Sequence, residues 1–265
     1  MIRGPVCVEG RNVSHAWALA VLELVSRGTQ AIAPLVVTVT GFPDGVVMED
    51  AGVRCAIDRA LLAEEMRPVR TVANTIFPKS MWNPATERHR LYERYSRALP
   101  RILRSDTANR YGVYFQRMIA YRPEGAEDPV NQLEHVITTW AGGNHRRSAL
   151  QVIVFDPTRD HSDQRQRGFP CLHQVSFTPV MDTLVVTGFY GTQYLFERGY
   201  GNYLGLCELG QFAAQEMGLR LVRMTCVAGF AELGIPKGNC DDLVAELQAA
   251  VQVRHYPAPA VNTEE

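Results

Sequence analysis

The chain has 265 residues, of which 46% are hydrophobic, and its 27 basic and 28 acidic residues give a formal net charge of −1. This length and apolar content suffice for one large core, so we expect a single domain over residues 1–255 and a mobile tail over 256–265. The balanced charge excludes a general attraction to nucleic acids or anionic membranes, and we expect neither as a partner. The apolar runs are too short to cross a bilayer, and the first residues lack the apolar segment of a secretory signal.

Six cysteines are scattered along the chain without a close pair. This spacing is typical of reduced thiols in the cytoplasm, where we expect the protein to reside. Cys171 and His173 are two positions apart and would share a strand face, but two ligands do not make a metal site. We therefore expect no metal, and we expect the cysteines other than Cys171 to behave as small hydrophobic residues.

The first half of the chain predicts three helices and one strand. Residues 12–14 offer a helix N-cap, and the periodicity of residues 16–25 predicts a helix that ends at Gly28. Residues 31–40 are rich in β-branched side chains and predict a strand. Residues 51–66 and 86–104 predict helices, the second punctuated by Pro100. Six arginines of that last segment predict a solvated face rather than a nucleic-acid patch: Arg88, Arg90, Arg94, Arg97, Arg101 and Arg104.

The second half of the chain contributes most of the predicted strands. Residues 131–140 predict a helix, and residues 149–155, which have almost no polar side chain, predict a central strand. Two strands joined by a turn near Met181 follow, then a helix over residues 203–217 and a strand over 219–227. The sequence has no internal repeat and none of the GxGxxG, GKS/T, HExxH or GxSxG motifs.

Cys171 is the candidate nucleophile because it follows a Gly-Phe-Pro loop at the start of a predicted strand. Three arginines precede it, and positive charge favours the thiolate form: Arg159, Arg165 and Arg167. One candidate function is a thiol enzyme that pairs Cys171 with His173. For that enzyme only Asp182 and Glu197 are available as an orienting acid.

Five short motifs occur in an order that resembles the thymidylate synthase family, over about residues 105–230. They are Tyr111-Gly112 with Phe115, the helix start at residues 131–137, Arg146-Arg147-Ser148, Phe169-Pro170-Cys171, and Tyr200-Gly201-Asn202-Tyr203. The resemblance implies an α/β fold, with a large mixed sheet flanked by helices. It also implies a homodimer in which one sheet face packs on its counterpart.

The resemblance further implies a reaction in which the Cys171 thiolate adds to C6 of a pyrimidine nucleotide. The activated C5 then attacks a one-carbon unit carried by 5,10-methylenetetrahydrofolate, and hydrogen-bond donors stabilise the enolate. In this scheme Asn202 contacts the base edge, and Tyr111 carries a proton or orients water. Arg146 and Arg147 reach the phosphate across the dimer interface. Ser176 is counted with the substrate-binding residues.

Several positions depart from the family pattern. His173 is shifted one place from the family's histidine, and hence to the other face of the strand. Gly191 stands where the family has a phosphate-binding arginine, Tyr194 where it has an aspartate, and Asn74 where it has the catalytic glutamate. Residues 229–231 lack the His-x-Tyr pair that reads the ribose. Substrate specificity should therefore differ from ordinary thymidylate synthesis.

Two functions remain after these departures. The first is a divergent enzyme that transfers a methyl or hydroxymethyl group to C5 of a pyrimidine nucleotide through a Cys171 adduct. The second is a non-catalytic dimer of the same fold that binds a nucleotide or another partner. An alkylating reagent distinguishes them, because an enzyme should have a Cys171 that is more reactive than the other cysteines and is protected by a pyrimidine ligand.

Overall fold

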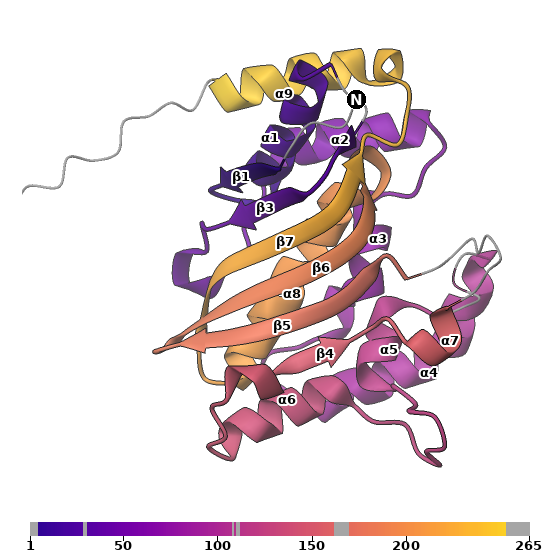
Figure 1. Ribbon diagram of the computed structural model, residues 1–265, viewed down its shortest axis with the longest axis vertical. Coiled ribbons are helices and arrows are strands. Elements are labelled where there is room, and N and C mark those ends of the chain that lie inside the picture. Colours follow the sequence, from indigo (N-terminus) through magenta and orange to yellow (C-terminus); the bar gives the residue numbers. More distant parts are fainter. Residues whose placement is uncertain (1–4, 29–30, 108, 110–111, 162–169, 253–265) are drawn as a thin grey trace, which may run out of the picture.

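The computed structural model of the protein describes all residues except 1–4, 29–30, 108, 110–111, 162–169 and 253–265. In the described part of the chain, seven strands form one mixed sheet in the order β1-β3-β7-β6-β5-β4, and the short β2 pairs with the end of β7. Helices flank the sheet, so the protein has a mixed α/β fold (Figure 1). The strands are β1 (Val6–Gly10), β2 (Ala31–Ile32), β3 (Leu35–Val39), β4 (Gln151–Ile153), β5 (Leu172–Val180), β6 (Thr183–Tyr194) and β7 (Arg220–Glu232).

The helices divide between the covered face of the sheet and its β4 edge. Figure 1 shows α8 and α3 behind β5, β6 and β7, and α4, α5 and α6 beside β4. The α-helices are α1 (Val13–Ser26), α2 (Ala51–Ala63), α3 (Val69–Ile76), α4 (His89–Ser105), α5 (Tyr114–Ile119), α6 (Gln132–Ala141), α7 (Pro157–Asp160), α8 (Tyr200–Glu216) and α9 (Asp241–Gln252). A π-helical turn, η5 (Leu195–Gly199), joins β6 to α8.

The predicted helices of the first half are present, with shifts of a few residues at their ends. The side chain of Asn12 accepts a hydrogen bond from the backbone N–H of His15 at 2.8 Å and caps α1, which ends before Gly28 with its φ of 65°. Asp50 caps α2 in the same way. Helix α4 runs through Pro100, where the sequence predicted an interruption. Pro100 therefore lies inside a continuous helix.

Two strand predictions are wrong. Residues 31–40 form two strands rather than one, with Pro34 between them, because proline has no N–H to give to a sheet ladder. Residues 149–155 do not form a central strand: β4 is an edge strand that pairs with β5 alone. Val152 and the flanking Leu150 and Val154 are buried, and α5 and α6 pack against this strand, whereas Ile153 is exposed. A helix layer can thus produce the same apolar pattern as a second neighbouring strand.

The two faces of the sheet are covered differently. Along β3, alternate residues such as Val37 are buried toward α1, whereas Val36 and Thr38 on the other face are only half-buried. The side toward the viewer in Figure 1 has no helix over β5, β6 and β7. The strand register aligns two rows of side chains across this uncovered face. One row is Cys7, Val36, Val227, Phe189 and Gln174, and the other is Glu9, Thr38, Thr225, Thr187 and Ser176.

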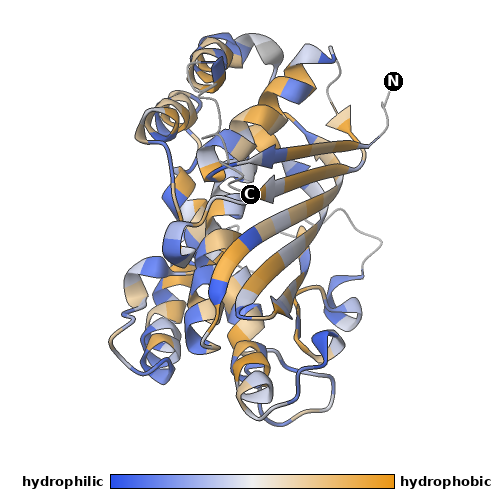
Figure 2. Cartoon of the chain, turned by 90° about the vertical axis from the view of Figure 1, so that its left-hand side faces the viewer, coloured by the Kyte–Doolittle hydropathy of each residue, from blue (hydrophilic) through white to orange (hydrophobic). Residues whose placement is uncertain are grey.

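Helix α8 passes through the core, and most of its residues are buried on all sides. Glycines allow α3 to approach it closely: a Cβ at Gly201 would lie 2.5 Å from Cβ of Val72, and one at Gly205 would lie 2.8 Å from the carbonyl oxygen of Ala73. Figure 2 colours each residue by hydropathy and shows orange, hydrophobic residues along the strands of the sheet. The close contact brings the first turn of α8 and one side of α3 to the same cavity.

Candidate functional site

A cavity of about 620 Å³ lies where the start of β5, the end of β6, η5, α3, α5 and the C-terminal turn of α4 meet. Its volume is in the range of ordinary small-molecule sites. Cys171 and Asn202, which the sequence analysis singled out, both line it, as do Asn74 and Tyr194. The structure therefore brings together, in one hollow, four positions that are far apart in the sequence.

Cys171 is half-buried in this cavity, immediately before β5. Its carbonyl oxygen accepts a hydrogen bond of 3.0 Å from the N–H of Gly191 in β6, which fixes its backbone against the neighbouring strand. Burial raises the pKa of its thiol, and the positive charge of Arg198 opposes that rise. Of the arginines predicted to favour the thiolate, Arg165 and Arg167 lie outside the described residues. Arg198 was not considered for this role in the sequence analysis.

Arg198 reaches the cavity because η5 is π-helical. Such turns widen the helix by one residue and are frequent at functional sites. Arg198 forms an ion pair of 2.7 Å with Glu197, and both side chains line the cavity. No motif in the sequence predicted this turn, since π-helical turns depend on how the flanking strand and helix pack.

The tyrosine beside Cys171 is Tyr114, at the start of α5. The pKa of Tyr114 is raised to about 12, chiefly by burial and also by the proximity of Cys171, while hydrogen bonds with the backbone of Leu172 and Cys171 oppose the rise. Tyr111, the predicted catalytic tyrosine, lies outside the described residues. Among the described residues, Tyr114 is therefore the hydroxyl that could carry a proton beside Cys171. The sequence motif pointed to Tyr111 instead.

A second tyrosine lies beneath the first. Tyr190 in β6 is 1% exposed, pairs with Leu172 across the sheet, and burial raises its pKa well above the usual value. Within the described residues its hydroxyl has no hydrogen-bond partner. An unpartnered buried hydroxyl is costly. Together with Tyr114 it surrounds the thiol with groups that are neutral at physiological pH.

Two asparagine amides face the same hollow. Asn202, in the first turn of α8, is 5% exposed, and none of the described residues hydrogen-bonds its side chain. Asn74 in α3 has a buried Oδ1 without a partner among the described residues. An amide offers both a donor and an acceptor, which suits the edge of a pyrimidine base. Both amides are therefore available to hydrogen-bond a polar group that enters the hollow.

The charged residues of the cavity are paired with each other. Besides Arg198 with Glu197, Arg67 pairs with Asp106, and the buried Arg117 makes two hydrogen bonds to Asp160, at 2.5 and 2.9 Å. The Arg117 guanidinium holds the pKa of Asp160 below its usual value against the opposing effect of burial. The described part of the cavity is thus close to electrically neutral. A phosphate group would need additional positive charge.

The predicted phosphate-binding residues and Ser176 do not line this cavity. Arg146 and Arg147 are exposed on the loop before β4, and Arg147 donates a hydrogen bond of 3.1 Å to the carbonyl oxygen of Pro179. Ser176 lies on the uncovered sheet face and accepts a hydrogen bond of 3.0 Å from Gln151. Within one chain these residues are separate from Cys171.

His173 does not share the cavity with Cys171, contrary to the expectation that both lie on one strand face. The register of β5 shifts between Leu172 and Gln174, and this irregularity turns the imidazole toward the rings of Phe155 and Phe189. Asp182 lies in the turn at the other end of β5, paired with Arg220. A Cys-His-acid triad built on Cys171, His173 and Asp182 is therefore not formed.

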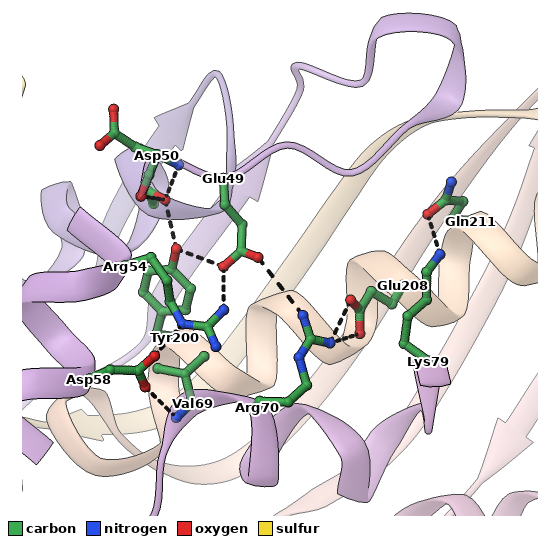
Figure 3. Close-up of polar contacts among 11 residues, drawn as sticks. Glu49, Asp50, Arg54, Asp58, Val69, Arg70, Lys79, Tyr200, Glu208 and Gln211 are labelled. Carbon is green, nitrogen blue, oxygen red and sulfur yellow. Dashed lines mark hydrogen bonds and ion pairs between the residues drawn. The ribbon is translucent and has the colours of Figure 1, made fainter. Parts of the chain in front are cut away.

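A polar network behind the cavity holds α3 and α2 against α8 (Figure 3). Glu208, 4% exposed in α8, accepts two hydrogen bonds from Arg70, at 2.7 and 2.8 Å. Glu49 accepts hydrogen bonds from the hydroxyl of Tyr200 and from Arg54. Burial raises the pKa of Glu208, and Arg70 opposes this. The network lies on the side of α3 away from the cavity and has a structural role.

No protein-family model matches this chain, and no curated protein matches it. The described residues contain no group of three or more side chains that could hold a metal ion. In the same residues, no helix has the length and apolar character needed to cross a membrane. The assignment of function therefore depends on the geometry of the cavity and on the resemblance of the motifs.

Proposed function

We propose that the protein is a divergent member of the thymidylate synthase family, an enzyme that transfers a one-carbon unit to C5 of a pyrimidine nucleotide. The observation that carries the proposal is the shared cavity of Cys171 and Asn202, with a thiol and a free amide facing the same hollow. A pyrimidine that hydrogen-bonds the amide would present its ring to the thiol. The fold supports the proposal because the mixed sheet and the buried helix α8 position both residues rigidly.

The first step would form a bond between Sγ of Cys171 and C6 of the base, and the electron pair of the C5–C6 double bond would move onto C5 and the C4 oxygen. Asn202 and Asn74 can stabilise this enolate by hydrogen bonding. C5 would then bond to the one-carbon unit and lose its proton, which the Tyr114 hydroxyl or a water molecule it orients can relay. The bond between the one-carbon unit and its carrier would break and leave an exocyclic methylene group on C5. Hydride from the reduced carrier, or water, would add to this methylene, and loss of the Cys171 thiolate would then restore the C5–C6 double bond.

The one-carbon donor implied by the resemblance is 5,10-methylenetetrahydrofolate. Tyr194 lines the cavity, is 40% exposed and offers a ring on which a pterin could stack. When bound, this donor supplies the one-carbon unit. Methyl and hydroxymethyl products differ only in whether hydride or water completes the reaction, and both belong to the proposal.

The proposed enzyme is a homodimer whose uncovered sheet faces pack on each other. Phe189 is 43% exposed in the middle of one row of this face, beside Val227 and Gln174. Apolar side chains in the middle of a sheet are usually covered in the working protein. A partner subunit would also supply cationic groups that the cavity needs for a phosphate, and Arg146 and Arg147 are exposed residues that could provide them.

A second candidate function is nucleotide or partner binding without catalysis. The observation that favours it is the direction of the Cys171 pKa, which burial raises, because a neutral thiol is a poor nucleophile. This protein would keep the cavity and the dimer and would bind its ligand equally well after Cys171→Ser.

Isotope exchange at C5 separates the two functions. UMP, CMP and their deoxy forms, each deuterated at C5, are incubated with the protein in the presence and absence of methylenetetrahydrofolate. We expect deuterium release from one of them, and a loss of at least 100-fold in the Cys171→Ser variant, whose fold is checked by circular dichroism. If no substrate exchanges while a nucleotide binds wild type and Cys171→Ser with equal affinity, the binding function replaces the enzyme.

A further inference from the structure

Helix α4 has five arginines aligned along one face: Arg90, Arg94, Arg97, Arg101 and Arg104. We call them the arginine stripe. Their spacing alternates between four and three residues, so at 100° per residue they fall within an arc of about 80° and extend over about 21 Å of helix. All five side chains are exposed. The stripe is therefore a row of exposed arginines along the helix surface. Three of them, Arg94, Arg97 and Arg104, also donate hydrogen bonds to backbone carbonyl oxygens.

The opposite face of α4 is what attaches this helix to the protein. Leu91 and Tyr95 are buried, and the Tyr95 ring contacts Phe115 at 4.7 Å between centroids. Figure 1 shows α4 at the lower right edge of the molecule, outside α5. The amphipathic division explains why α4 is helical, but a solvated face could be made equally well from mixed charges. Five residues of one sign need a further reason.

The charge of the stripe is largely uncompensated. Among the described residues its only ion pair joins Arg97 to Glu93, at 3.7 Å between highly exposed side chains. Arg88, at the start of the helix, points elsewhere and pairs with Glu134 and Glu216. The cavity arginines likewise have acidic partners. In a chain with a net charge of −1, the stripe is thus a local concentration of positive charge.

We propose that the arginine stripe binds the phosphodiester backbone of a nucleic acid. Guanidinium groups suit phosphates, and a row of arginines with about 5 Å along the helix between successive positions matches a chain of phosphates better than a single nucleotide. The net charge of −1 led us to expect no nucleic-acid partner. A balanced net charge excludes only long-range attraction, and the arginine stripe can still bind phosphates locally. The proposal is independent of the function assigned to the cavity.

The composition of the surface favours a nucleic acid over an acidic protein. Protein interfaces rely on large apolar or aromatic side chains at their centre. The exposed large hydrophobic residues of the described chain all lie outside α4. Binding to a phosphate backbone needs no such anchors, since release of counterions supplies most of the free energy. The stripe has no exposed aromatic side chain for base stacking, so we expect binding with little sequence preference.

The salt dependence of binding should report the number of phosphates contacted. Five contacts on a single strand give a slope of about −3.5 in the logarithmic plot of affinity against salt, or about a 100-fold loss between 50 and 200 mM. Replacing two arginines should reduce the slope to about −2 and the loss to about 20-fold.

The test is fluorescence anisotropy with a labelled 20-nucleotide oligomer, single-stranded or annealed to its complement, and the full-length protein. We compare Arg97→Glu/Arg101→Glu with Arg59→Glu/Arg220→Glu, a matched pair of exposed arginines on α2 and β7 that changes the net charge equally. We expect at least 10-fold weaker binding at 50 mM salt for the stripe variant, less than threefold for the control, and retention by Arg97→Lys/Arg101→Lys. The single-stranded and duplex arms show which form binds more tightly.

Two results would overturn the proposal. One is the absence of oligomer binding by wild type at 50 mM salt. The other is an equal loss in the stripe variant and in the matched control, which would mean that net charge alone matters. If a polyglutamate peptide binds the stripe while neither oligomer does, the partner is an acidic protein and the nucleic-acid assignment is wrong. Circular dichroism of each variant excludes unfolding as a cause.

Discussion

At the scale of single residues, burial and the positive charge of Arg198 act in opposite directions on the pKa of the Cys171 thiol. Burial alone would keep the thiol protonated, and Arg198 is the described cation that opposes it. Arg198 is itself paired with Glu197. A ligand that excludes water from the cavity would strengthen the electrostatic interactions of Arg198 with the Cys171 thiol and with Glu197. The residue that decides thiolate formation is thus not adjacent to the cysteine in sequence.

We predict that Arg198→Gln slows alkylation of Cys171 by iodoacetamide about 3- to 10-fold at pH 7, because loss of the nearby cation raises the thiol pKa further. Arg198→Lys should restore most of the rate. The measurement is a pH–rate profile by mass spectrometry, which distinguishes Cys171 from the exposed Cys7 and Cys55. A profile that is unchanged in Arg198→Gln would show that the arginine does not act on the thiol.

At the scale of secondary-structure elements, the position of α3 on α8 sets the shape of the cavity. Glycines on α8 allow the helices to approach, and the network of Glu208, Arg70 and Glu49 holds them from the other side. Glu208 is buried whereas Arg70 is 39% exposed, so the carboxylate bears most of the desolvation cost of this ion pair. The pKa of Glu208 shows the cost: burial raises it despite Arg70.

The raised pKa of Glu208 has a defined consequence for stability. The folded protein holds the proton of the Glu208 carboxyl more tightly than the unfolded chain does. The protonated carboxyl therefore contributes its full stabilisation below the pKa of the unfolded chain, and this stabilisation is lost as the pH rises through the pKa of the folded protein. Glu208→Gln removes this dependence. Arg70 is not left isolated, since it is partly exposed and lies 3.9 Å from Glu49.

We therefore predict that the free energy of unfolding of Glu208→Gln, relative to wild type, is higher at pH 7 than at pH 4.5. The difference between the two pH values should be on the order of 1 kcal/mol. Urea denaturation of wild type and variant at both pH values measures this double difference. Glu246→Gln, at an exposed carboxylate paired with Arg59, serves as the control. A variant that loses more stability at pH 7 than at pH 4.5 would show that the ion pair outweighs desolvation.

At the scale of the whole molecule, one sheet face is covered by helices and the other is not. The uncovered rows combine threonines with apolar side chains such as Val36, Val227 and Phe189. The proposed dimer through this face would bury these rows, and the resemblance to the thymidylate synthase family implies that Arg146 and Arg147 of each subunit reach the other subunit's site. The neutral cavity and the exposed arginines would then be two halves of one site.

We predict that Phe189→Glu converts the dimer to a monomer, because two like charges would meet without water in the middle of the interface. Multi-angle light scattering at micromolar concentration measures the mass. Leu62→Glu, a change at the most exposed leucine, on α2, is the control and should leave the dimer intact. Wild-type protein that is monomeric at 100 μM would contradict the proposed assembly.

The sequence by itself determined the elements whose signals are local. The cap at Asn12, the turn at Met181 and the periodicity of α1, α2, α4 and α6 predict these elements within a few residues, because capping and periodicity act over single turns of chain. The motif order also placed Cys171 and Asn202 in one site, and the structure puts both on one cavity.

Only the tertiary structure decided the features that depend on packing between distant segments. It made β4 an edge strand covered by helices, placed Tyr114 beside the thiol, and turned His173 away from it at an irregularity of β5. It also brought Arg198 to the cavity through a π-helical turn. Burial and charge proximity are properties of the folded arrangement, since they arise from neighbours that no local sequence pattern encodes.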